Sequence, residues 1–107
     1  MPRLLALSLL ALVLSSCTED QIEAEWSAWL DEHNACESVD DCAMVTPDCP
    51  LGCGDGVRTE DLAAAEAKAN ALIAAWSGGV QNCAYDCLQL ELSCTANRCT
   101  TTPVEEF

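Results

Sequence analysis

This 107-residue chain contains nine cysteines, whose thiols could form disulfides, bind a metal or take part in redox chemistry. Apart from Cys17, they lie in the C-terminal two-thirds, at Cys36, Cys42, Cys49, Cys53, Cys83, Cys87, Cys94 and Cys99. An even set of eight in a small exported domain predicts a disulfide framework of four bridges. No pair has the C-x-x-C spacing of zinc knuckles or of thiol–disulfide exchange motifs. We therefore expect structural disulfides rather than a metal or redox centre.

The pairing of these cysteines does not follow from their spacing, because eight cysteines allow many connectivities. We expect local closure of Cys36 with Cys42. We also expect bridges from the segment Cys49 to Cys53 onto Cys83 and Cys87.

Other reactive residue types are sparse. His33 is the only histidine, which excludes a multi-histidine metal site and leaves a helix-cap or surface role. No serine stands in a G-x-S-x-G frame. Four acidic residues would suit calcium by ligand type, but their spacing lacks the register of an EF-hand loop: Asp48, Asp55, Glu60 and Asp61. The sequence predicts no catalytic residue, no metal site and no cofactor, and we expect that the protein is not an enzyme.

The N-terminus has the order of a secretory signal peptide. Arg3 supplies a positive charge, Leu4 to Leu14 is apolar, and the two small residues Ser15 and Ser16 precede Cys17. The apolar run is about half the length needed to cross a bilayer, about 20 residues, so a transmembrane helix is disfavoured. Two alternatives remain: ordinary secretion, with Cys17 as an incidental thiol, and no export.

The run Leu14-Ser15-Ser16-Cys17 resembles the lipobox of bacterial lipoproteins. The resemblance implies that residues 1–16 are removed and that Cys17 is lipidated, leaving one extracytoplasmic domain at 17–107. It also implies two or three acyl chains, such as palmitate, which suffice for stable membrane attachment. The odd cysteine count agrees, since assigning Cys17 to the lipid leaves eight for disulfides. Thr18 is not the aspartate that retains such proteins in the inner membrane, so outer-membrane delivery is implied in a Gram-negative host. In a Gram-positive host, the anchor would lie in the cytoplasmic membrane.

The mature chain would be strongly acidic. Three basic residues, Arg58, Lys68 and Arg98, oppose eighteen acidic ones, which gives a charge near −15. Nucleic-acid binding and electrostatic docking on anionic lipid both need a basic surface, so both are disfavoured. An acidic surface that keeps the protein soluble explains the charge. A cation or a basic partner remains the alternative.

Two helices and a small sheet are expected to position these residues. Thr18 and Gln21 fit a capping box at the start of a helix over 19–33. A second helix is expected from Thr59 to the Gly78-Gly79 pair, because alanine and an apolar stripe dominate it. Period-two patterns and β-propensity suggest an antiparallel sheet of residues 42–46, 88–94 and 99–104. The fold class is therefore α+β, a small disulfide-rich domain with two helices packed on a short antiparallel sheet.

The segment Thr46 to Gly56 is expected to be a loop, because prolines and glycines interrupt it. Its turn Cys53-Gly54-Asp55-Gly56, which precedes a helix, resembles that of Kazal-type protease inhibitors over fewer than ten residues. The tyrosine and the helix cysteine expected after that turn are missing. We expect Pro50, Leu51 and Asp55 to form a binding loop from which Leu51 projects into solvent. The alternative is that Leu51 packs inward.

The leading hypothesis is a lipid-anchored, non-enzymatic binding or structural module of the cell envelope with an unidentified partner. The alternative is an inhibitor of a secreted protease acting through the loop Cys49–Val57.

Overall fold

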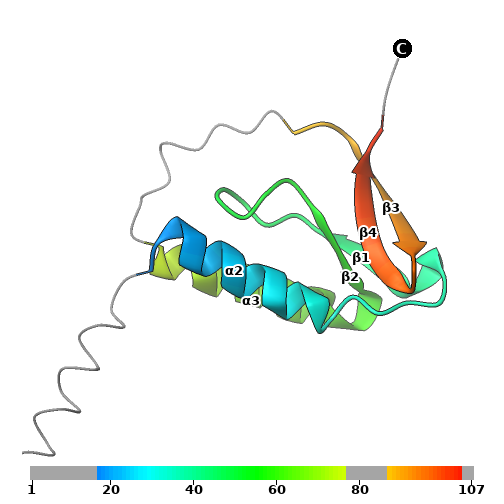
Figure 1. Ribbon diagram of the computed structural model, residues 1–107, viewed down its shortest axis with the longest axis horizontal. Helices are drawn as coiled ribbons and strands as arrows, with labels where there is room; N and C mark the ends of the chain where they lie inside the picture. The colour runs from blue at the N-terminus through cyan, green and yellow to red at the C-terminus, as the bar shows by residue number, and fades with distance from the viewer. Residues whose placement is uncertain (1–16, 77–86, 105–107) are drawn as a thin grey trace, which may run out of the picture.

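The computed structural model describes residues 17–76 and 87–104, which form two helices and two small antiparallel sheets (Figure 1). The helices are α2 (Glu19–Asp31) and α3 (Leu62–Ala75). One sheet contains β1 (Cys42–Val45) and β2 (Asp55–Arg58), and the other contains β3 (Leu90–Thr95) and β4 (Arg98–Pro103). Two single 3-10 turns, η1 (Val39–Asp41) and η2 (Thr59–Asp61), precede β1 and α3. The expected α+β, disulfide-rich fold class is confirmed.

Helix α2 begins at the predicted capping box. The Thr18 hydroxyl accepts from the Gln21 amide at 3.3 Å, and the Gln21 side chain accepts from the Thr18 amide at 2.8 Å. These two bonds satisfy backbone donors that a helix start leaves unpaired. Ile22 and Trp26 then bury one face of the helix. The helix ends at Asp31, two residues before the expected limit.

Helix α3 packs beside α2 through small side chains. Ala65, Ala69 and Leu72 are buried on its inner stripe, and alanines allow the two helices to approach closely. Lys68 on α3 pairs with Glu25 on α2 at 3.0 Å, outside this contact. The expected terminator Gly78-Gly79 lies outside the described residues, and the helix is capped by Trp76.

The strands pair differently from the expected three-stranded sheet. β1 pairs with β2, so that Val45 faces Asp55, and β3 pairs separately with β4. β2 lies partly in the segment expected to be a loop, and that expectation is wrong for Asp55 and Gly56. Its sequence, Asp-Gly-Val-Arg, has no alternation of apolar and polar residues to reveal a strand.

Gly56 explains how the two sheets meet. A Cβ on Gly56 would lie 2.7 Å from the backbone carbonyl carbon of Cys99, so only glycine fits where β2 meets β4. The disulfide Cys42–Cys99 then links β1 to β4. The two hairpins are therefore joined by close backbone contact and by a covalent bond.

The apolar core lies between the helix pair and the β1–β2 hairpin. Its buried members are Ile22, Trp26, Val45, Leu51, Val57, Ala65, Ala69 and Leu72. A second buried cluster consists of Cys36, Cys42 and Cys99. Sulfur thus fills the space between the two hairpins that apolar side chains would fill in a larger domain.

Candidate functional site

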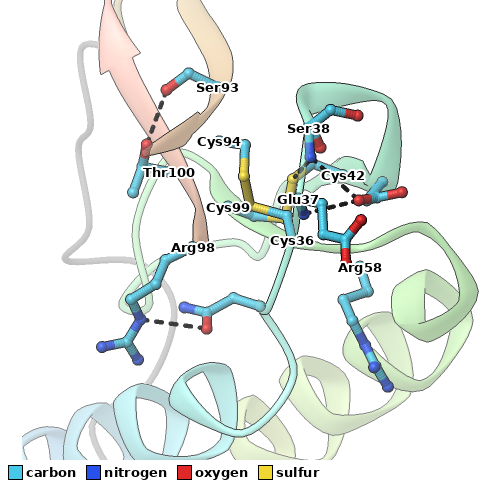
Figure 2. Close-up of a disulfide and its surroundings, with 12 residues drawn as sticks. Cys36, Glu37, Ser38, Cys42, Arg58, Ser93, Cys94, Arg98, Cys99 and Thr100 are labelled. Carbon is cyan, nitrogen blue, oxygen red and sulfur yellow. Dashed lines mark hydrogen bonds between the residues drawn. A yellow bond between two sulfur atoms is a disulfide. The ribbon is translucent and has the colours of Figure 1, made fainter. Parts of the chain in front are cut away.

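The described cysteines mostly join distant parts of the chain. Disulfides link Cys36 to Cys94 and Cys42 to Cys99, at sequence separations of 58 and 57. The two bridges lie beside each other (Figure 2). Cys36–Cys94 joins the loop after α2 to β3, and Cys42–Cys99 joins β1 to β4. The expected local bridge between Cys36 and Cys42 is wrong.

The backbone explains this pairing. The Cys36 amide donates to the Asn97 carbonyl at 3.0 Å, and the Cys99 amide donates to the Asn34 carbonyl at 2.7 Å. These bonds hold residues 34–36 alongside β4, and Ala35 forms an antiparallel bridge with Arg98. Cys36 therefore meets the hairpin rather than its neighbour in sequence.

A third disulfide joins Cys53 to Cys87, as expected for a bridge from the central loop to the later cysteine pair. Cys49 is disulfide-bonded as well. Cys83 lies outside the described residues.

Three buried sulfurs are close enough to suggest a metal centre. The Sγ atoms of Cys36, Cys42 and Cys99 all lie within 4.8 Å of one another. Metal coordination requires thiolates, however, and each of these sulfurs is already in an S–S bond. In the oxidised protein, this cluster is a covalent brace.

Cys17 lies at the edge of the folded domain. Its amide donates to the Ala75 carbonyl at 3.1 Å, and its backbone forms a parallel bridge with Trp76 at the end of α3. Its side chain is half-buried against the apolar core. The capping residue Thr18 follows at once, so Cys17 directly precedes the capping box of α2.

The expected binding loop is arranged differently. Leu51 is 9% exposed and belongs to the apolar core, and its amide donates to the Asp48 carbonyl at 2.9 Å. Pro50 is buried as well. The expectation that Leu51 projects into solvent is therefore wrong. Burial of a leucine side chain stabilises a fold by about 1.5–3 kcal/mol, which explains why the only large apolar residue of this loop turns inward.

Asp55 belongs to β2 and faces α2. Its Oδ2 atom accepts from the Trp26 indole nitrogen at 3.0 Å. Burial raises the pKa of the Asp55 carboxyl above its usual range, and the hydrogen bond from Trp26 opposes part of that rise. The carboxyl also lines a hollow of about 270 Å³ together with polar side chains, among them Ser27, Asp31, Asn34, Thr100 and Thr101.

A larger hollow, of about 650 Å³, lies between the loop before β1 and the start of η2. Its charged lining residues are Glu37, Asp40, Asp41, Arg58 and Glu60. The amides of Glu37 and Ser38 donate to the Asp41 carboxylate and lower its pKa. Arg58 pairs with Asp61 at 2.9 Å and with Glu60 at 3.5 Å. These carboxylates suit a hydrogen-bond donor or a cation, and none of the lining residues is a serine, histidine or free thiol.

Sequence reasoning missed an aromatic row that runs along α2 and just past its end. Trp26 stacks on Trp29 with ring centroids 5.8 Å apart, and Trp29 stacks on His33 at 3.8 Å. The Nδ1 atom of His33 lies 2.6 Å from the Trp29 carbonyl, which fits the expected helix-cap role. The available signal was the spacing of residues 26, 29 and 33, which suits one face of a helix continued past Asp31.

No protein-family model matches the chain, and no characterised protein and no solved structure shows significant similarity to it. Among residues 17–76 and 87–104, neither helix has the length and apolar character needed to span a membrane.

Proposed function

We propose that the chain is the precursor of a bacterial lipoprotein, anchored to the extracytoplasmic face of a membrane through lipid on Cys17. The observation that carries the proposal is the run Leu14 to Cys17 at the end of an apolar N-terminal stretch. The start of the fold supports it, because the capped helix begins directly after Cys17. The disulfides also suit an oxidising compartment outside the cytoplasm.

We further propose that the mature domain, residues 17–107, is a non-enzymatic binding or structural module of the cell envelope. The acidic hollows favour a cationic partner or one rich in hydrogen-bond donors. The alternative, inhibition of a secreted protease through the loop Cys49–Val57, loses its strongest argument with the burial of Leu51. A pull-down from envelope extracts separates the two. A retained protease that loses activity favours inhibition, and a retained non-protease partner favours the module.

Replacing Cys17 tests the anchor. The wild-type protein is expected in the membrane fraction, with an intact mass that corresponds to residues 17–107 plus acyl groups. Cys17→Ala should remain unprocessed or become soluble, because the acceptor thiol is gone. Ser16→Ala is the matched control, since alanine keeps a small residue before Cys17 and should be processed normally. A soluble wild-type protein without acyl mass would contradict the proposal.

A further inference from the structure

We infer that one end of the molecule lies directly on the bilayer surface, without a flexible linker between lipid and fold. This anchor end consists of Cys17, Thr18, Ala75 and Trp76. The inference rests on the proposed lipidation of Cys17 and adds the orientation of the domain and the lipid class that it faces.

Hydrogen bonds fix the backbone of Cys17 and Thr18 to the folded domain. The Cys17 amide is hydrogen-bonded to Ala75, and Thr18 is fixed by two bonds of the capping box. An N-acylated cysteine retains one amide proton, so the bond to the Ala75 carbonyl survives acylation. A free amino group would also suit this position, because cations are stabilised at a helix C-terminus. Acyl chains on Cys17 therefore start within the folded surface.

The helix pair points from the anchor end toward the β3–β4 hairpin. The N-terminus of α2 and the C-terminus of α3 lie at the same end of the molecule, and the β3–β4 hairpin lies away from it (Figure 1). The 13 residues of α2 span about 20 Å. Membrane attachment at Cys17 thus keeps the disulfide cluster away from the lipid surface.

The anchor end also contains an aromatic side chain. Trp76 is half-buried there and packs against the core beside Cys17. Tryptophan favours the boundary between lipid and water, because its ring is apolar and its N–H is polar. Trp26 and Trp29 lie roughly 10–15 Å further along α2, by its rise per residue.

The negative charge of the anchor end determines which lipid headgroups it can face. Glu19 and Asp20 occupy the first turn of α2, and the last turn of α3 has no basic residue. Anionic headgroups would be repelled by these carboxylates. The anchor end therefore fits a zwitterionic surface such as phosphatidylethanolamine or phosphatidylcholine.

Tryptophan quenching tests this placement. Acylated protein purified from membranes is reconstituted into phosphatidylcholine vesicles with brominated acyl chains. We expect partial quenching in the wild type and loss of most of it in Trp76→Phe, because the remaining tryptophans are far from the lipid. Phosphatidylglycerol in the vesicles should weaken the quenching. A Gly-Ser insertion of about 12 residues between Cys17 and Thr18 adds about 20 Å of reach and should abolish it.

Each result has a clear meaning. Equal quenching in the wild type and the insertion variant, or no quenching in the acylated wild type, overturns the inference while the lipoprotein assignment stands. Equal quenching in the wild type and Trp76→Phe also overturns the inference and leaves the lipoprotein assignment in place. A protein without acyl mass overturns both. If Trp76→Phe has no cooperative melting transition, the comparison of the wild type with the insertion variant decides.

Discussion

At the scale of single residues, Leu51 makes the loop between β1 and β2 part of the core. It belongs to one buried cluster with residues of both helices and of both strands of the first hairpin. Leu51→Asp is expected to lower the free energy of unfolding by at least about 3 kcal/mol, because it buries a charge and removes apolar contact. Thermal melting followed by circular dichroism measures the loss.

Leu88→Asp is the matched control for this change, because Leu88 is 64% exposed. Its melting temperature should stay close to that of the wild type. Equal melting temperatures for Leu51→Asp and Leu88→Asp would show that Leu51 does not stabilise the core.

Asp55 predicts a pH dependence of stability. Burial raises its pKa in the folded state, so the folded state binds the proton more tightly than the unfolded state does. Its contribution to stability is complete below the unfolded pKa of about 3.9 and is lost as the pH rises through the higher folded pKa. Asp55→Asn keeps an oxygen that can accept from Trp26 and removes the titration. Wild-type stability should therefore fall relative to Asp55→Asn as the pH rises from about 4 to 7.

Urea unfolding with the disulfides intact, repeated across this pH range, measures that difference. Asp20→Asn, an exposed change on α2, serves as the control and should not reproduce the trend. A wild type that gains stability over Asp55→Asn with rising pH would contradict the assignment.

At the scale of elements, Gly56 holds two hairpins together. Gly56→Ala would place a Cβ 2.7–2.9 Å from backbone and Cβ atoms of Cys99, and the Cys42–Cys99 bridge keeps β4 from moving away. We expect a loss of about 1–3 kcal/mol, as for other overpacked sites. Gly54→Ala meets the flexible end of Leu90 instead and should lose less. Chemical denaturation measures the free energy of unfolding of both variants. The prediction is wrong if Gly54→Ala is the less stable of the two.

The elements also show what the sequence can predict. α2 and α3 follow from a local capping box and an alanine-rich stripe, and β3 and β4 follow from alternation and a short turn. β2 could not be predicted in this way, because its glycine is required by Cys99, which is remote in sequence. Local sequence patterns predict a helix or strand when the residues of that element determine it. They fail where backbone that is distant in sequence determines the element.

The candidate site follows the same division. Cysteine number and type predicted disulfides, but Cys36 pairs with Cys94 because residues 34–36 run along β4. Proline and glycine predicted the irregular backbone around Leu51, yet they contain no information about the direction of its side chain. That direction is set by the apolar cluster that Leu51 joins, whose other members come from α2, α3 and the β1–β2 hairpin.

At the scale of the whole molecule, the disulfides replace part of a missing core. Closing loops of the size set by Cys36–Cys94 and Cys42–Cys99 stabilises by about 4 kcal/mol each in the chain-entropy model, with less for the second because the loops overlap. The double variant Cys42→Ala with Cys99→Ala should unfold at much lower urea concentration than the wild type, since both cysteines are buried.

The bridge Cys53–Cys87 gives a matched comparison, because Cys87 is exposed and Cys53 is only half-buried. Removing that bridge with two alanines should be less destabilising. An equal or greater loss at Cys53 and Cys87 would contradict a central role for the buried sulfur cluster.

The long bridges also bear on how the protein survives damage. A single peptide-bond cleavage anywhere between Cys53 and Cys87 leaves both fragments joined through Cys36–Cys94, Cys42–Cys99 and Cys53–Cys87. The N-terminal fragment would retain Cys17, so a lipid there would hold the C-terminal fragment at the membrane as well. A protease that cleaves the chain once in this interval would release neither fragment, and the cleaved protein would run as separate bands only after reduction.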